Sequence, residues 1–499
     1  MTRHWTIIAL LLVAAFFRAQ MLSGEVRFHP DEAFFAAFAR NAAVRGEWLL
    51  PGDLDKTPLT IYAQAVAMLL TGITWDGAVW RLDVQQGEFA ARLPGFYSGV
   101  LLVAVMAAVS RRLRAGMLPV VLVALSPVAI VFAPTAFTDT PMVLCVMLAV
   151  LFALRGHGAW AGVWLAVAYA CKQQAVLFVP LVVLLLLSRR DASWPRPYRR
   201  LAAFAVAAGA MLLPLFIWEL LRPYPAITAL ATANNAPEQW LVPVDGLWPR
   251  ALAWLNLTRW WFGGAVGVIL VVFAGVGWAR HGPSSTHAGA ITIFLIGYAL
   301  LHWLVPLNIY DRYVFAVLPL VALVIGLVLP RHWIVCVLVG ALMVPGAWQA
   351  ATGQIPVGGD RGDHATIIQL ADYLNSREFG AIVYDRWLGW ELNYYLGGWS
   401  DRRRAYYPTV TEMTADPEIY VADVAPRYLP APHAVQMDEW LAALHAAGFE
   451  SCVGYRDDLF TVYVLTHPPG GDETSASALA EQHCRSYRRY SPVPGAPPG

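Results

Sequence analysis

One short stretch of this chain gathers acids, bases and aromatic rings that are scarce elsewhere in it. Residues 28–62 carry Asp31, Glu32 and Lys56. A carboxylate within hydrogen-bond reach can take the proton of an attacking hydroxyl, and a fixed lysine can neutralise negative charge on a departing group. These residue types therefore suit a group transfer to a hydroxyl. A structural role stays open, with the acids in the first turn of a helix and the lysine facing lipid headgroups.

Pro30 predicts the start of a helix that carries both acids. Its missing N–H costs nothing at the first helical position, and acids there meet the positive end of the helix dipole. The helix would place Phe34, Phe35 and Phe38 near one side. That pattern is typical of a helix that lies in a membrane interface.

The composition indicates a polytopic membrane protein. Of the 499 residues, 58% are hydrophobic and only 14% are charged, whereas a soluble domain carries about a quarter charged residues. The deficit is concentrated in apolar runs long enough to cross a bilayer. No basic cluster interleaved with aromatic residues indicates a nucleic-acid partner.

We expect about eleven membrane-spanning helices. The first apolar run, residues 6–21, is interpreted as an uncleaved span because no convincing cleavage site follows it. Residues 59–73 are barely long enough to span and are predicted to form an interfacial or re-entrant helix. The other predicted spans are residues 93–110, 117–133, 139–154, 159–171, 175–188, 201–221, 259–279, 288–306, 313–329 and 333–348.

The distribution of basic residues predicts the orientation of these spans. One set of connections is rich in arginine, namely Arg111, Arg112, Arg114, Arg155, Arg189, Arg190, Arg196, Arg199, Arg200, Arg280 and Arg331. The opposite loops hold fewer and scattered basic residues, namely Lys56, Lys172, Arg222, Arg250 and Arg312. Basic loops stay in the cytoplasm. The N-terminus is therefore predicted inside, and the loop with Asp31 and everything after Gly346 outside.

The chain is predicted to consist of a membrane domain, a small external domain and a tail. The membrane domain covers residues 1–349, with its first external loop at 23–91, and residues 350–467 form an α/β domain outside the membrane. Its predicted elements are helices at 365–379 and 437–449, a strand at 380–385 and an alternating strand at 458–466. Residues 468–499 have the composition of a disordered end.

The five cysteines give no metal signal because none form a CxxC pair. Cys145, Cys171 and Cys336 lie in apolar runs and are predicted to be small core residues. Cys452 and Cys484 fall in the external part, where they either form a disulfide or stay free.

Several short motifs follow one another in a recognisable order. Residues 29–36 read HPDEAFFA, residues 45–51 read RGEWLLP and residues 55–62 read DKTPLTIY. Three further motifs come later, namely Arg92-Leu93-Pro94, Thr138-Asp139-Thr140-Pro141 and Asp311-Arg312-Tyr313. Over residues 5–330 this order resembles the C-type glycosyltransferases that use lipid-phosphate sugars. That group includes the protein O-mannosyltransferases and the aminoarabinose and lipopolysaccharide-core sugar transferases. One departure is Thr57, where the family has proline.

The resemblance implies a GT-C fold and a reaction. A sugar would pass from a polyprenyl-phosphate donor to an acceptor hydroxyl, with inversion, at the outer face of a bacterial cytoplasmic membrane. It implies that Asp31 is the general base and that Lys56, helped by Arg312, contacts the donor phosphate. Glu32 points about 100° away from Asp31 on a helix and is better suited to orienting the loop. No cofactor is expected, and a divalent metal is left open.

Four residues have two or more interpretations each. Asp139 is either a second catalytic acid or a first-turn helix acid with Thr138 as the cap. Arg92 either anchors a span among headgroups or contacts the phosphate. Lys172 is either functional or a lysine that extends to the membrane surface from a helix end. His29 could cap the Pro30 helix, join a metal site with Asp31, or do neither.

Two other classes of protein compete with the transferase. A transporter or flippase for lipid-linked sugars would place ionisable residues or broken helices near the bilayer midplane, often in matching halves. A non-catalytic envelope scaffold would leave the order of the motifs as coincidence. The acids gather instead in an external loop, which favours the enzyme. Its acceptor is open among a glycan, a lipid and a protein.

Overall fold

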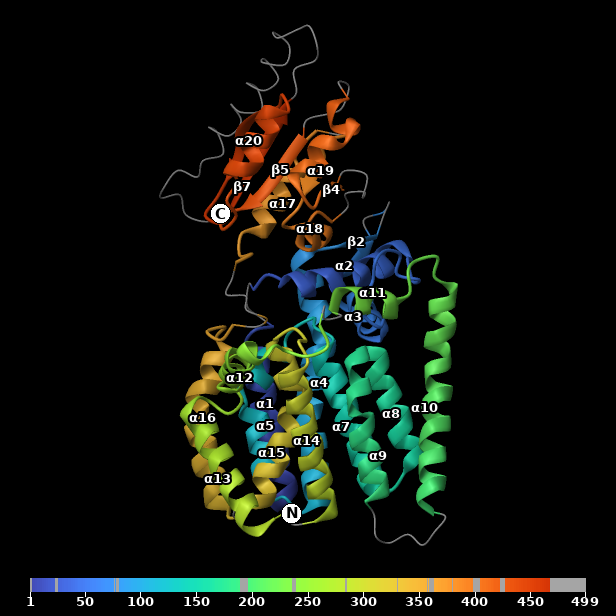
Figure 1. Ribbon diagram of the computed structural model, residues 1–499, viewed down its shortest axis with the longest axis vertical. Coiled ribbons are helices and arrows are strands. Elements are labelled where there is room, and N and C mark those ends of the chain that lie inside the picture. The colour runs from blue at the N-terminus through green and yellow to red at the C-terminus, as the bar shows by residue number, and fades with distance from the viewer. Residues whose placement is uncertain are drawn as a thin grey trace. The chain divides into compact units, whose positions relative to one another are not determined.

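The chain divides into two compact units (Figure 1). The computed structural model describes residues 2–22, 26–75, 77, 80–188, 196–235, 239–282, 285–329, 331–356, 358, 363–378, 380–397, 404–421 and 427–466. The first unit comprises residues 1–25 and 38–361, and the second comprises residues 26–37 and 362–499. Helix α2 (Pro30–Arg45) belongs to both, because its first half clusters with the second unit. The predicted disordered tail, 468–499, lies outside the described residues.

The first unit is built from apolar helices (Figure 1). Their bounds are α1 Thr2–Ala19, α3 Leu59–Thr71, α4 Val84–Leu113, α5 Leu118–Leu125, α6 Pro127–Phe132, α7 Asp139–Arg155, α8 Gly158–Cys171, the 3-10 helix η1 Gln173–Phe178, α9 Val179–Leu187, α10 Arg196–Leu221, α11 Ile227–Asn235, α12 Val244–Thr258, α13 Ala265–His281, α14 Thr286–Leu304, α15 Asp311–Val328 and α16 Trp333–Ala351. Most of each predicted span falls on helix, but residues 259–264, the start of the span predicted at 259–279, form a turn before α13. Among the described residues, five helices are long and apolar enough to cross a membrane: α4, α10, α14, α15 and α16.

Two further predicted spans differ in detail from the helices observed. Residues 117–133 form α5 and α6, because Ser126 has an extended backbone before Pro127 and its hydroxyl accepts from Ala129 N at 3.3 Å. The span predicted from residue 93 begins at Val84, because Asp83 caps the helix by accepting from Gln86 N at 2.9 Å.

Small residues let neighbouring helices of the first unit approach closely. A Cβ on Gly158 of α8 would lie 2.1 Å from the carbonyl oxygen of Arg200 on α10, and one on Gly162 would lie 2.3 Å from that of Phe204. The four-residue spacing puts both glycines on one face of α8. A larger side chain at either position would force the two helices apart.

The aromatic side of α2 packs inside the protein. Phe35 and Phe38 are only 3% and 7% exposed, and the Phe38 ring lies 3.4 Å from the Cβ position of Gly52. The prediction that these rings face a membrane interface was therefore wrong. The spacing of apolar residues along a helix shows which side is buried, but it does not show whether lipid or protein covers that side.

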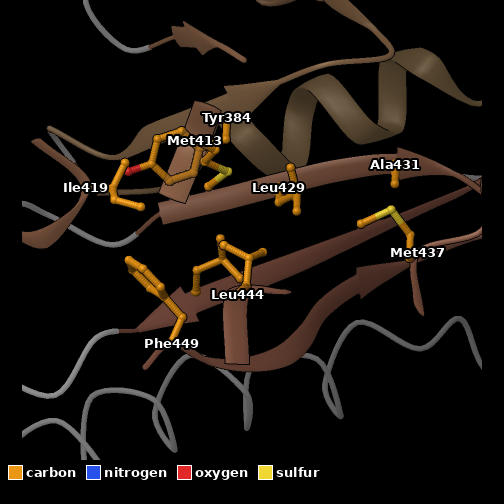
Figure 2. Packing of buried hydrophobic residues seen from close by; sticks show 9 residues of the cluster. Tyr384, Met413, Ile419, Leu429, Ala431, Met437, Leu444 and Phe449 are labelled. Carbon is orange, nitrogen blue, oxygen red and sulfur yellow. The ribbon is translucent and has the colours of Figure 1, made fainter. Parts of the chain in front are cut away.

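The second unit contains a mixed five-stranded sheet of order β4-β3-β5-β7-β6. Its strands are β3 Ile382–Asp385, β4 Arg404–Tyr406, β5 Arg427–Pro432, β6 Glu450–Arg456 and β7 Phe460–Thr466, and its helices are α17 Ile367–Asn375, α18 Gly389–Tyr395, α19 Val410–Ala415, η3 Pro417–Tyr420 and α20 Asp438–Ala446. Strand β3 runs parallel to β4 and β5, whereas β7 runs antiparallel to β5 and β6. The apolar core includes Tyr384, Leu429, Leu444 and Phe449 (Figure 2).

Asp385, at the end of β3, makes the stability of this unit depend on pH. Burial raises the pKa of this carboxyl from its ordinary value of 3.8 to about 6, and Glu391 adds to the shift while Arg404 opposes it. The folded state therefore binds the proton more tightly than the unfolded state. The contribution of Asp385 to stability is therefore full below about pH 4 and is lost as pH rises through about 6, by roughly 2–3 kcal/mol.

We expect Asp385→Asn to flatten this dependence, because the amide does not titrate. The measurement is the thermal unfolding midpoint of the second unit between pH 4 and 7 in the purified full-length protein. An unchanged slope in the variant would assign the pH dependence to another group.

Candidate active site

The first turn of α2 is organised by reciprocal capping. The imidazole Nδ1 of His29 accepts from Asp31 N at 3.1 Å, and the Glu32 carboxylate accepts from His29 N at 3.1 Å. The predicted helix start is thus confirmed, and His29 acts as the cap. Glu32 is buried and bonds the loop backbone, which agrees with an orienting role.

Asp139 and Lys172 form a buried ion pair in the first unit. Lys172 Nζ lies 2.6 Å from Asp139 Oδ1, and the two side chains are 6% and 1% exposed. Asp139 begins α7, and Lys172 separates α8 from η1. The headgroup interpretation of Lys172 was wrong because its ammonium points into the protein. Asp139 lies in the first turn of α7 with Thr138 at the N-cap position, as that interpretation predicted, but Thr138 makes no side-chain cap bond.

Lys56 lies on the loop before α3. It bonds the carboxylate of Asp55. Gln173 Nε2 donates to the Asp55 carbonyl at 2.5 Å, and Asn234 Nδ2 lies 3.4 Å from the Asp55 carboxylate. These contacts tie the Lys56 loop to η1, one residue beyond Lys172. Thr57, the departure from the family pattern, donates to the Tyr169 carbonyl at 2.8 Å.

Arg312 approaches from the start of α15. Its guanidinium lies over the rings of Tyr310 at 4.6 Å and Phe137 at 5.5 Å. The neighbouring Asp311 carboxylate accepts from Arg312 N and from Gly358 N, each at 2.8 Å. This fixes the first turn of α15 and hence the place of the guanidinium.

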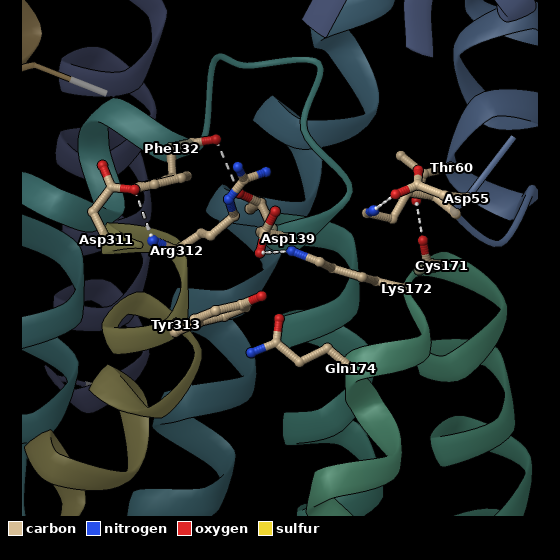
Figure 3. A network of polar contacts seen from close by, with 12 residues as sticks. Asp55, Thr60, Phe132, Asp139, Cys171, Lys172, Gln174, Asp311, Arg312 and Tyr313 are labelled. Atoms are coloured by element: carbon tan, nitrogen blue, oxygen red, sulfur yellow. Dashed lines mark hydrogen bonds and ion pairs between the residues drawn. The ribbon is translucent and has the colours of Figure 1, made fainter. Parts of the chain in front are cut away.

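Aromatic and amide groups line the cluster beside Lys172 (Figure 3). The Lys172 ammonium lies 5.8 Å from the centre of the Tyr313 ring. Tyr298 donates to the Tyr313 carbonyl at 3.0 Å and accepts from Gln174 Nε2 at 3.2 Å. Rings at this distance stabilise a cation and exclude water.

Three cations and three carboxylates meet in this cluster. Arg312 and Lys56 both act on the Lys172 ammonium, which the Asp139 carboxylate stabilises. Each of the other two cations also has a neighbouring carboxylate, Asp55 for Lys56 and Asp311 for Arg312. Among the described residues, Asp139 Oδ2 has no hydrogen-bond partner. Three cations held in a poorly hydrated place can bind an anion such as a phosphodiester. Within the described ranges, no group of three or more His, Cys, Asp or Glu side chains is placed to hold a metal ion.

The positions of the lysines in the sequence also point to this cluster, although the motifs alone did not reveal it. Lys56 and Lys172 are the only two lysines among the 35 lysines and arginines of the chain. Both lie in this cluster. An ammonium is a compact point charge, whereas a guanidinium is a planar fork. The two ammonium groups therefore differ in shape and hydration from the arginines of the chain, including Arg312 of the same cluster.

The remaining predicted residues are carried by other elements. Arg92 is 4% exposed within α4, so it does not anchor a helix start among headgroups. Asp31 and Glu32 belong to the second unit, whereas Lys56, Asp139 and Arg312 belong to the first.

A second residue that was missed, Arg222, holds the loop before Lys56. From the end of α10 its guanidinium donates to three carbonyls, those of Leu49 at 3.2 Å, Leu50 at 3.1 Å and Gly52 at 2.8 Å. Leu50 has φ +50°, a conformation that L residues rarely adopt without support. Arg222 supplies that support by fixing the loop backbone.

We expect Arg222→Met to raise the KM for the lipid-linked donor about tenfold. Three carbonyls would lose a charged donor, and about 1.4 kcal/mol is enough for a tenfold change. Initial rates at varied donor concentration measure the effect. The same change at Arg155, at the far end of α7, serves as control. An unchanged donor KM would show that the loop keeps its conformation without Arg222.

Part of the chain matches a known protein family. The sequence model of the dolichyl-phosphate-mannose-protein mannosyltransferase family matches residues 55–218. No curated protein sequence is similar enough to count as a match. The range 55–218 holds Lys56, Asp139 and Lys172.

Solved structures resemble the whole chain. ArnT from Cupriavidus metallidurans in the apo state is 16% identical with a TM-score of 0.63, and ArnT bound to undecaprenyl phosphate is 17% identical with a TM-score of 0.59. Each match covers 93% of this chain and 98% of the ArnT chain. The Archaeoglobus fulgidus oligosaccharyltransferase is 10% identical over 90% of this chain and 73% of that one, with a TM-score of 0.49.

The chain thus has the GT-C fold of ArnT, with a C-terminal sheet. The family match and the shared fold confirm the predicted resemblance to the C-type glycosyltransferases. The predicted enzyme class, a membrane glycosyltransferase, is confirmed with it.

Proposed function

We propose that this glycosyltransferase moves a sugar from a polyprenyl-phosphate carrier to an acceptor hydroxyl, with inversion at the anomeric carbon. The observation that carries the proposal is the cluster of Lys56, Lys172 and Arg312 around buried Asp139. The departing lipid phosphate develops negative charge, which fixed cations stabilise best where water is excluded. The undecaprenyl phosphate bound to ArnT supports this class of donor.

The reaction assigns a role to each group. The acceptor oxygen attacks the anomeric carbon, its proton passes to the Asp31 carboxylate, and the bond from that carbon to the phosphate oxygen breaks. Lys56 and Arg312 bind the phosphate. Lys172, held by Asp139, adds the third positive charge. Asp31 takes its role from the motif and its place in the first turn of α2.

Glu32 and Arg92 receive supporting roles. Glu32 orients the first turn of α2 through His29 N. Arg92, buried in α4, would contribute positive charge to donor binding. Asp139 acts as the counter-ion that fixes Lys172 and does not carry the proton. The acceptor is a glycan, a lipid or a protein.

We place the reaction at the outer face of a bacterial cytoplasmic membrane, with the N-terminus in the cytoplasm. The arginine-rich connections support this orientation. Cys452, on β6, is disulfide-bonded, and disulfides persist in oxidising compartments. This supports an external C-terminal domain of residues 350–467. The predicted partner, Cys484, lies outside the described residues.

Donor binding tests the proposal at Lys56. We expect Lys56→Met to weaken binding of a short-chain polyprenyl phosphate 10- to 100-fold, because a charge-assisted contact contributes about 1.5–3 kcal/mol. Lys56→Arg should recover part of the affinity, because the charge returns in a different shape. Equal affinities in all three proteins would remove Lys56 from the donor site.

Chemical labelling gives an independent reading of the same site. Apart from the N-terminal amine, amine-reactive acetylation can modify only Lys56 and Lys172. Lys56 is 17% exposed and Lys172 6%, so Lys56 should react first. Bound polyprenyl phosphate should protect it. A donor that leaves the acetylation rate unchanged would contradict the assignment.

A further inference from the structure

The turn that carries Asp31 is held by the C-terminal domain. Phe28, three residues before Asp31, is completely buried, and its N–H donates to the Tyr395 hydroxyl at 2.7 Å. Its ring meets Tyr394 edge-on, with the ring centres 4.8 Å apart. A buried N–H needs an acceptor, and this one comes from a residue 367 positions away in the chain.

A second contact lies on the other side of Asp31. Phe34, three residues after it, packs against Trp390 with ring centres 5.2 Å apart. Both Trp390 and Tyr395 belong to α18 (Gly389–Tyr395). The two contacts therefore bracket Asp31 and fix its turn relative to a single helix.

Helix α18 is itself anchored firmly in the second unit. Arg404 donates to the Gly389 carbonyl at 3.0 Å and to the Asn393 side chain at 2.9 Å. Glu391, only 3% exposed, lies 2.9 Å from His364. Polar contacts along the first five residues of α18 tie it to the strand β4 and to the segment before α17. The helix can therefore act as a rigid support.

We propose that α18 positions the Asp31 carboxylate, with Tyr395 as a positioning residue for proton removal from the acceptor. This rests on the proposed function, in which Asp31 is the base. It gives the C-terminal domain a part in the reaction, because the domain holds the turn that bears the base. The two units then have different tasks. The second unit holds the base, whereas donor binding depends on residues of the first unit.

The test removes only the hydroxyl. Tyr395→Phe keeps the ring but leaves Phe28 N without its acceptor. We expect kcat to fall about 10- to 100-fold, the cost of a small misplacement of a reacting group. The donor KM should stay within twofold, and the solvent deuterium isotope effect on kcat should rise. Tyr463→Phe, the same change on β7 beside the domain core, should match the wild type.

A double-mutant cycle distinguishes positioning from general damage. If Tyr395 acts through Asp31, Tyr395→Phe has no further effect on kcat in an Asp31→Asn background. A loss that adds to that of Asp31→Asn, or a Tyr395→Phe enzyme with wild-type kcat, would overturn the inference. Should Tyr395→Phe fail to fold, Trp390→Leu makes the same test. Trp390 is 50% exposed, and this change leaves no polar group unpaired.

Failure of the inference differs from failure of the proposed function. If the wild type transfers sugar and Asp31→Asn does not, the function stands, and the behaviour of Tyr395→Phe decides the inference alone. If Asp31→Asn is fully active, the base is wrong and the inference falls with it.

Discussion

Replacing Asp31 with asparagine should reduce kcat for sugar transfer by about 10²- to 10⁴-fold, the contribution typical of general acid–base catalysis. Asparagine keeps the size of the side chain but cannot accept the proton. It also leaves the Asp31 N–H bond to His29 in place, so folding should be preserved. Donor binding should change little, because the phosphate contacts lie on other residues. Single-turnover transfer in detergent, normalised to the amount of folded protein, measures the effect.

The control for this experiment is Asp245→Asn. Asp245 is an exposed acid in the first turn of α12, so the same chemical change is made at the same kind of helix position. Its activity should equal that of the wild type. An Asp31→Asn enzyme as active as Asp245→Asn would show that the carboxylate at position 31 is only a first-turn helix acid.

Removing the Lys172 ammonium should cause the largest loss of stability. Lys172→Met removes the ammonium that pairs directly with the Asp139 carboxylate, which is 1% exposed. Breaking one side of a buried pair costs about 3–5 kcal/mol, while replacing both partners by apolar groups is often neutral. We therefore expect little folded Lys172→Met protein, and near-normal yield of Lys172→Met/Asp139→Leu, measured by size-exclusion chromatography in detergent.

The double variant also separates stability from function. Since it lacks the third cation, its sugar transfer should remain at least 100-fold below wild type even though it folds. Recovery of transfer along with folding would reduce the pair to a structural role. Lys172→Arg is the sharper variant. A guanidinium is larger and flatter than the ammonium that lies 2.6 Å from Asp139, so we expect this enzyme to be impaired despite its charge.

Local signals account for what the sequence could predict. Pro30 followed by two acids marked the first turn of α2, and long apolar runs marked the helices of the first unit. In the second unit, strand β3 and helices α17 and α20 follow simple periodicity. Strand β5 escaped prediction because it contains Pro430 and Pro432, which rarely occur within a strand.

The candidate site was only partly predictable because it depends on packing. Lys56 and Arg312 were found through motifs. The partnership of Asp139 with Lys172, 33 residues away, exists only because α7 packs on α8. The same holds for Arg222, whose acceptors lie about 170 residues earlier. Hydrophobic periodicity reports which face of a helix is buried, but it does not report which polar group meets which.

In the proposed reaction a lipid-phosphate sugar is the donor, and Lys56, Lys172 and Arg312 receive its phosphate. Transfer of radiolabelled sugar from polyprenyl phosphate in proteoliposomes tests this, with wild type and Lys56→Met compared at several donor concentrations. We expect transfer by the wild type and a 10- to 100-fold higher donor KM in the variant. Movement of the intact lipid-linked sugar across the bilayer without any transfer would contradict it, and would instead favour a transporter.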